Sequence, residues 1–185
     1  SSAASDVYKR QSLFPVEQPS SAFLMTLSYN TYAMSYRHFI GIIGAGSADD
    51  SLKKIAETCG LLIAKRGAVL ICGGLGGVME AAAKGARSAG GLTVGILPGD
   101  SRVSANPHID IPVATGLAEG RNIIIVRSAD GFIAIGGEYG TLSEIAFALK
   151  AGKPVIGINT WDIKGVIKAL TPEEAVEKLF QILGG

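Results

Sequence analysis

The chain has 185 residues, of which 48% are hydrophobic and 6% aromatic, and its formal net charge is +1. That length suits one domain with a sizeable core, the charge leaves no basic field for non-specific nucleic-acid binding, and no apolar run reaches the ~18 residues of a membrane span. The cysteines, Cys59 and Cys72, lie in apolar segments without a second Cys or His at metal spacing, which favours buried reduced thiols in a cytoplasmic protein and argues against a metal site.

Residues 1–36 differ from the rest of the chain, because they are Ser-rich and irregular, with Pro15 and Pro19 and no sustained period. The apolar part at 22–27 is too short and too poorly flanked by positive charge for a signal peptide. The opening residues are similar to translated adapter sequence at the ends of metagenomic gene predictions. We therefore expect a non-native or disordered leader over 1–36, with Met34 as a candidate natural start, and one domain over 37–185.

The first predicted strand, residues 38–43, leads into Gly44-Ala45-Gly46-Ser47, and a helix capped by Ser47 and the acids after it runs to about residue 65. A Gly-x-Gly after a first strand is part of the dinucleotide-binding fingerprint. Here Asp49 replaces the third glycine, and the second strand, 68–72, ends without an acid for a ribose hydroxyl. The sequence therefore disfavours NAD or FAD.

The second strand runs into the loop Gly73-Gly74-Leu75-Gly76-Gly77, followed by a predicted helix over 78–89. Glycines in such a loop either permit a tight turn or let the backbone approach a ligand. The third strand is predicted at 92–97, a short strand-like piece at 109–113, and a helix at 115–129 that carries Arg121. Arg121 is either a surface residue or a phosphate clamp, because a guanidinium matches phosphate oxygens bidentately.

The stretch 129–151 contains the central functional motif of the chain. A buried strand is predicted at 131–135, and the loop Gly136-Gly137-Glu138-Tyr139-Gly140 follows at once, before a helix that opens at Thr141. A strand, a glycine-rich turn and a helix N-terminus together form an anion site, because free N–H groups and the helix dipole point at the turn. We therefore predict phosphate binding at this loop.

A structural alternative exists for the same residues. Thr141 and Glu144 fit a capping box, and Thr171-Pro172-Glu173-Glu174 repeats that pattern before the last predicted helix, 172–183, without any glycine loop. The glycines and the strand before Thr141 therefore carry the specificity of the phosphate prediction.

Strands and helices alternate through the last central strand, 154–158, which predicts a Rossmann-like, doubly wound α/β domain with a mainly parallel sheet. The βα loops of such a sheet open onto one carboxyl edge. Trp161, after that strand, is expected to pack under a loop rather than stack on a base. The near-continuous apolar run at 145–149 exceeds one buried face, so we expect a homodimer or higher homo-oligomer.

Two motifs resemble those of LOG-type proteins. Residues 73–79 are similar to their Gly-Gly-Gly-x-x-Gly-Leu-Met loop, and 140–144 to the end of their Pro-Gly-Gly-x-Gly-Thr-x-x-Glu motif. With the intervening Arg121, the match covers roughly residues 39–158. LOG-type proteins, once labelled lysine decarboxylases, are cytokinin riboside 5′-monophosphate phosphoribohydrolases. The runs 120–122 and 135–141 are more similar still to a branch of the SLOG superfamily related to DprA/Smf proteins and molybdenum cofactor carrier proteins.

The resemblance implies that Arg121 and Glu144 are catalytic, with Arg121 holding phosphate or ribose. An ionised Glu144 would stabilise the oxocarbenium character that develops on ribose when the N-glycosidic bond breaks, and no metal is needed. The candidate ligand- and phosphate-binding residues are Gly44, Gly46, Ser47, Gly73, Gly74, Gly76, Met79, Gly136, Gly137, Glu138, Gly140 and Thr141.

The chain departs from the hydrolase pattern at two positions. Glu138 enters the loop where hydrolases have glycine, and Asn122 stands where they have lysine. Both changes reduce the positive potential. Two hypotheses follow: a phosphoribohydrolase that releases a free base and ribose 5-phosphate from a nucleoside 5′-monophosphate, or a non-catalytic carrier of a nucleotide or of the molybdenum cofactor, a pterin phosphate. Neither requires a further cofactor.

Overall fold

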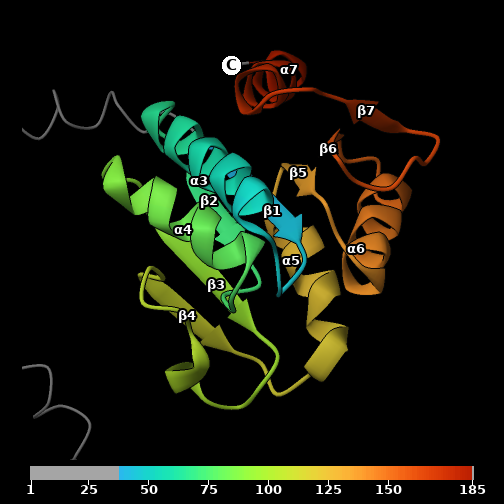
Figure 1. Cartoon of the computed structure of the whole chain (residues 1–185). Coiled ribbons are helices and arrows are strands. Elements are labelled where there is room, and N and C mark those ends of the chain that lie inside the picture. Colours follow the sequence, from blue (N-terminus) through green and yellow to red (C-terminus); the bar gives the residue numbers. More distant parts are fainter. Residues whose placement is uncertain (1–37, 185) are drawn as a thin grey trace, which may run out of the picture. The chain divides into compact units, whose positions relative to one another are not determined.

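A computed structural model describes residues 38–184, and the predicted leader at 1–36 lies outside the described residues (Figure 1). The strands of the described part are β1 (Phe39–Gly44), β2 (Val69–Cys72), β3 (Thr93–Leu97), β4 (Ile111–Ala114), β5 (Gly131–Ile135), β6 (Val155–Ile158) and β7 (Val166–Lys168). Its helices are α3 (Asp50–Lys65), α4 (Val78–Ser88), α5 (Asn122–Ser128), α6 (Tyr139–Lys150) and α7 (Pro172–Leu183), with 3₁₀ turns η2 (Arg102–Ser104) and η3 (Ala118–Arg121).

The strands form one sheet in the order β4-β3-β2-β1-β5-β6-β7, and every pairing is parallel. The order reverses at β1, because the chain proceeds from β1 to β2 on one side and later adds β5 on the other. Ligands of open α/β sheets bind at such a switch point, outside the carboxyl ends of the strands. The doubly wound fold expected from the alternation of strands and helices is thus confirmed.

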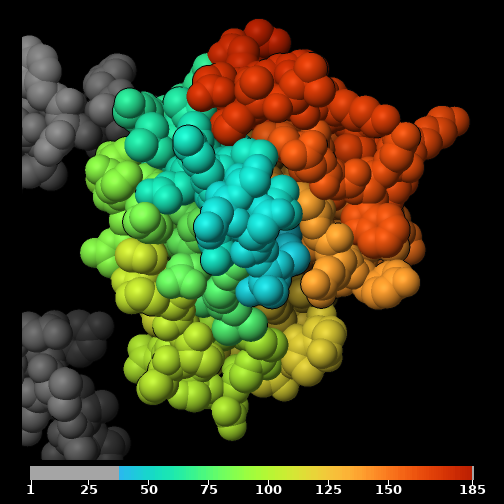
Figure 2. Space-filling view, viewed as in Figure 1, coloured from blue at the N-terminus to red at the C-terminus, as the bar shows by residue number. Residues whose placement is uncertain are grey.

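Helices cover both faces of the sheet. α3, α4 and α7 lie on one face and α5 and α6 on the other (Figure 1), and the space-filling view from the same side shows the cyan-to-teal segment that contains α3 in the middle of the visible face and the red α7 at its top (Figure 2). Successive strand residues point to opposite faces, so Ile40 and Ile42 join the core under α3, α4 and α7, whereas Ile43 joins the core under α5 and α6. The sheet is therefore the middle layer of three.

The free thiols of Cys59 and Cys72 are buried, and burial raises their pKa values to about 12 and about 11. Both groups therefore stay protonated at neutral pH, and their burial agrees with the prediction from their apolar sequence context. None of the helices between residues 38 and 184 is both long and apolar enough to cross a bilayer.

The helix expected over 115–129 starts later than predicted. Thr115 still belongs to the strand edge, because its N–H and its hydroxyl both donate to the carbonyl of Leu97, at 3.2 and 2.7 Å. Gly116 and Ala118 then take positive φ angles of 65° and 46°, which a regular α-helix does not contain. The regular helix α5 therefore begins at Asn122, and Arg121 lies on the turn before it.

Candidate functional site

The loops after β1, β2 and β5 meet at the carboxyl edge of the sheet. Gly44 pairs with Ile135 at the ends of β1 and β5. The N–H of Val78, after the β2 loop, donates to the carbonyl of Ala45 at 3.1 Å. The predicted glycine loops are thus neighbours around the switch point.

Arg121 is buried beneath these loops. The residue is only 8% exposed, and its Nε and Nη1 have no hydrogen-bond partner among the described residues. A Cβ on Gly73 would lie 2.8 Å from Nη2 and closer still to Nη1, so the guanidinium rests directly on the β2 loop. Burial lowers the pKa of Arg121 and the nearby Glu144 carboxylate opposes that shift, but an arginine remains charged. A buried cation with unused donors is therefore available to an anion.

Glu144 shares this buried region from the second turn of α6. It is 7% exposed, and burial raises its carboxyl pKa to about 7 although Arg121 acts in the opposite direction. The carboxyl therefore titrates near neutral pH. Such a group can accept or release a proton during a reaction or during binding.

The glycine loop before α6 has a fixed shape. Gly137 has a φ of 119°, which side-chain-bearing residues rarely adopt. The N–H of Gly136 donates to the carbonyl of Ile158 at 3.0 Å, and its carbonyl accepts from the hydroxyl of Thr160. The segment after β6 thus holds the loop in place and leaves the N-terminus of α6 accessible.

The structure corrects where this helix begins. α6 starts at Tyr139, with Glu138 as its N-cap and no side-chain capping bond. Thr141 lies inside the first turn and is 3% exposed, so the capping-box interpretation of Thr141 and Glu144 is wrong. At the matching sequence the interpretation is right, because the hydroxyl of Thr171 accepts from the N–H of Glu174 at 3.2 Å.

Asn122 has a role that sequence reasoning missed. The residue is 9% exposed, and its Nδ2 donates to the hydroxyl of Ser143 at 3.2 Å, which in turn donates to the carbonyl of Gly140 at 2.7 Å. This chain of bonds ties the start of α5 to the first turn of α6. At the position where the hydrolase pattern has a lysine, this protein therefore has an amide that links the residue after Arg121 to the helix after the glycine loop.

The predicted site residues divide into three groups by exposure. Buried beneath the loops are Gly73, Gly74, Met79, Arg121, Gly136, Thr141 and Glu144, and exposed at the rim are Gly46, Ser47, Glu138 and Gly140. Gly44, Gly76 and Gly137 are half-buried between them. The fold thus brings every predicted site residue to the same edge of the sheet.

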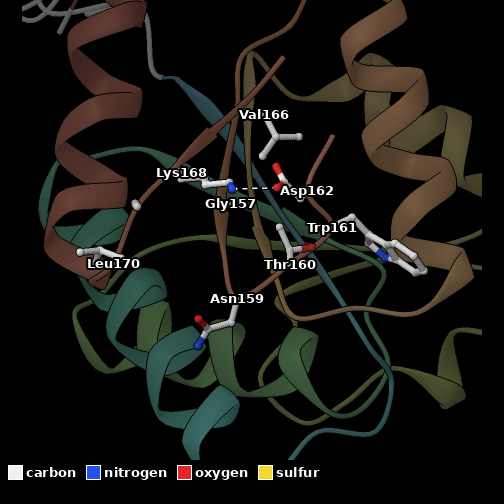
Figure 3. A pocket seen from close by; sticks show the side chains of 9 residues that line it. Gly157, Asn159, Thr160, Trp161, Asp162, Val166, Lys168 and Leu170 are labelled. Atoms are coloured by element: carbon white, nitrogen blue, oxygen red, sulfur yellow. Dashed lines mark ion pairs between the residues drawn. The ribbon is translucent and has the colours of Figure 1, made fainter. Parts of the chain in front are cut away.

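A cavity of about 230 Å³ lies beside this edge, in the segment that follows β6 (Figure 3). The ion pair between Asp162 and Lys168, 2.9 Å long, crosses it, and the indole of Trp161 turns away from that pair. None of the predicted ligand-binding residues lines the cavity. We therefore regard it as a neighbour of the candidate site. Among residues 38–184 no group of three His, Cys, Asp or Glu side chains could hold a metal ion.

Known proteins resemble this chain over most of the described domain. An uncharacterized protein of Archaeoglobus fulgidus is 54% identical over 138 residues, 74% of this chain and 91% of that protein. A cytokinin riboside 5′-monophosphate phosphoribohydrolase of Mycobacterium tuberculosis is 35% identical over 120 residues, 60% of this chain and 64% of the enzyme.

Among solved structures, the molybdenum cofactor binding protein of the phototrophic bacterium Rippkaea orientalis is 40% identical with a TM-score of 0.77, and the match covers 80% of this chain and 99% of that protein. The model of the SLOG cluster4 family matches residues 37–182. The match includes all three glycine loops, Arg121 and Glu144. The chain belongs to the SLOG cluster4 family.

Proposed function

We propose that this protein binds the molybdenum cofactor, a phosphate-bearing pterin, at the carboxyl edge between β1 and β5 and holds it without turnover. The observation that carries the proposal is the guanidinium of Arg121, which is buried, charged and without hydrogen-bond partners on Nε and Nη1. Buried donors without hydrogen-bond partners are costly, and a bound phosphate would satisfy Nε and Nη1.

The surrounding backbone fits the same ligand. The glycine loop leaves the N–H groups at the start of α6 free of side-chain capping, so a phosphate would meet these donors and the positive end of the helix dipole. The exposed carboxylate of Glu138 at the rim disfavours a second anionic group there. The site thus suits one phosphate joined to a larger, less charged body.

The relatives favour the carrier hypothesis over the hydrolase hypothesis. The Rippkaea protein, which is named for binding the molybdenum cofactor, is matched over 99% of its length at 40% identity. The mycobacterial phosphoribohydrolase is matched over only 64% of its length at 35% identity.

Binding of the molybdenum cofactor to the purified protein tests this proposal. The protein is incubated with cofactor released from a molybdoenzyme, separated by gel filtration, and assayed for retained pterin and molybdenum. We expect retention by the wild type and by Arg127→Gln, which removes an exposed arginine of the adjacent helix α5, and at least tenfold less retention by Arg121→Gln. Equal retention by Arg121→Gln, with an unchanged circular dichroism spectrum, would contradict the assignment of Arg121.

A second candidate function is favoured by Glu144. Its carboxyl lies in the same buried region as Arg121 and has a pKa of about 7, which is suited to activating water or to stabilising positive charge on a ribose. On this alternative the protein is a phosphoribohydrolase. It would release a free base and ribose 5-phosphate from a nucleoside 5′-monophosphate.

Base release from a panel of nucleoside 5′-monophosphates, followed by chromatography, tests the alternative. Release by the wild type that disappears in Glu144→Gln would establish the hydrolase. Glu173→Gln is the control, because it removes an exposed carboxylate of α7, outside the candidate site, and should leave base release unchanged. No release from any monophosphate would reject the hydrolase and leave binding as the function.

A further inference from the structure

Tyr139 is a prominent exposed aromatic residue beside the candidate phosphate site. It belongs to the glycine loop as its fourth residue, is the first residue of α6, and is 81% exposed. Phe147, on the same helix, is 40% exposed. Side chains in helices lean toward the helix N-terminus, so we expect the phenol ring on the side of the glycine loop.

Trp161 stands next to Tyr139 and is fixed to the same loop. Its indole Nε1 donates to the carbonyl of Glu138 at 3.3 Å, and the two ring centroids are 6.0 Å apart at an angle of 34°. Trp161 is half-buried, and it points away from the Asp162–Lys168 ion pair of the neighbouring cavity (Figure 3). The two rings are therefore neighbours, and the hydrogen bond from Trp161 anchors the pair to the loop.

We propose that Tyr139 and Trp161 form a stacking surface for a planar heteroaromatic ring whose phosphate is bound at the glycine loop before α6. This inference rests on the proposed phosphate site and names the part of the ligand that binds outside it. The chemical class is a pterin or purine joined to a phosphate through a short linker, because both offer a flat π-face and one terminal phosphate.

Three physical features support the assignment. A large exposed tyrosine side chain leaves apolar area in water, and a stacked ring would remove it. The hydrogen bond from Trp161 fixes one ring relative to the phosphate loop, which reduces the entropy lost on binding. Aromatic stacking also adds no charge, so it suits a rim where Glu138 already supplies a carboxylate.

The single tryptophan of the chain provides a direct signal. We would titrate the full-length protein with a pterin monophosphate, with guanosine 5′-monophosphate and with ribose 5-phosphate, which has no ring base, and follow both heat and Trp161 fluorescence. The two ring-bearing ligands are expected to quench the emission, and ribose 5-phosphate to bind more weakly without quenching. Whichever of the two ring-bearing ligands binds with higher affinity shows whether the preferred ring is a pterin or a purine.

Substitutions at Tyr139 test whether this residue forms the stacking surface. Tyr139→Ala should weaken the ring-bearing ligands about tenfold, the size of one aromatic stack, and leave ribose 5-phosphate unchanged. Tyr139→Phe, which keeps the ring, should match the wild type. Unchanged affinity for the ring-bearing ligands in Tyr139→Ala, an equal loss for ribose 5-phosphate, or binding without quenching would overturn the stacking surface while leaving the phosphate site intact. Failure of the wild type to bind any of the three ligands would overturn both proposals.

Discussion

The guanidinium of Arg121 occupies the space that a side chain at Gly73 would need. A Cβ built on Gly73 would lie 2.8 Å from Nη2 of Arg121 and 2.6 Å from the sulfur of Met79, distances shorter than van der Waals contact. The glycine at the end of β2 and the buried cation before α5 therefore require each other. This pair, 48 positions apart in sequence, joins two of the predicted motifs into one site.

Gly73→Ala should therefore displace Arg121. We predict at least a tenfold loss of affinity for the phosphate-bearing ligand, together with about 1–3 kcal/mol of destabilisation from overpacking. Calorimetric titration measures the first effect and urea unfolding the second. Gly99→Ala is the matched control, because a Cβ there meets no atom within 4 Å. Equal affinities of the two variants would show that Arg121 does not contribute to binding.

The raised pKa of Glu144 predicts a pH-dependent stability. Because its carboxyl pKa rises from 4.5 to about 7 on folding, the folded protein holds a proton that the unfolded chain releases between these values. The contribution of this proton to the free energy of unfolding is fully present below about pH 4.5 and is lost as the pH rises to about 7. The total loss is on the order of 3 kcal/mol. Glu144→Gln should remove this loss, so the variant gains stability over the wild type as the pH rises.

Urea unfolding of both proteins at a series of pH values from 4 to 8 measures this difference. Glu174→Gln provides a control of opposite sign. Hydrogen bonds from the N–H of Leu170 and from Lys178 lower the pKa of Glu174, so its contribution is present at neutral pH and lost as the pH falls. Parallel pH profiles for the wild type and Glu144→Gln would contradict the prediction.

Much of this fold was predictable because the central strands are apolar on both faces. Runs such as 131–135 lack alternation, and each is followed by glycines, which marks both the strand and its end. The three-residue strand β7 was not predicted, because Ile167 and Lys168 are exposed at the edge of the sheet and give no apolar run. Edge strands owe their position to pairing with a neighbour, which leaves little trace in composition.

The loops that form the site were predictable from the sequence, but the contacts between their side chains were not. Residue types alone do not separate Thr141 and Glu144 from the true cap at Thr171 and Glu174, because both match the same pattern. Packing separates them, since Glu144 is buried near Arg121 whereas Glu174 is only half-buried on α7. The bond between Asn122 and Ser143 joins positions 21 residues apart, and nothing in local sequence indicates it.

Lys153 caps the helix that begins next to Arg121. Its Nζ donates to the carbonyls of Val126 at 2.8 Å and Arg127 at 3.2 Å, and also to that of Ala129. These are carbonyls at the C-terminal end of α5, which lack helical partners and carry the negative end of the dipole. Lys153→Met should therefore cost about 1–3 kcal/mol of stability.

The midpoint of urea unfolding measures this cost. Lys150→Met is the matched control, because Lys150 is an exposed lysine near the end of α6, and its replacement should change the midpoint little. A midpoint for Lys153→Met equal to that of the control would show that water satisfies these carbonyls as well as the ammonium group does.

The outer face of α6 exposes apolar side chains. The apolar run at 145–149 is partly explained by the core, since Ile145 and Ala148 are fully buried, whereas Ala146 and Phe147 remain exposed. On the adjacent helix α5, Ile123 is 39% exposed. We predict that this α5–α6 face packs on a second copy of the chain, because apolar side chains on neighbouring helices gain from a shared interface.

Sedimentation equilibrium at micromolar concentration should therefore give a multiple of the chain mass for the wild type. Phe147→Glu should shift the mass toward that of a monomer, because the interface would have to bury a carboxylate. Leu170→Glu, a charge placed at an 87% exposed apolar residue that lies outside α5 and α6, should leave the assembly unchanged. A monomeric wild type would rule out the interface, and equal dissociation by both variants would place it elsewhere on the surface.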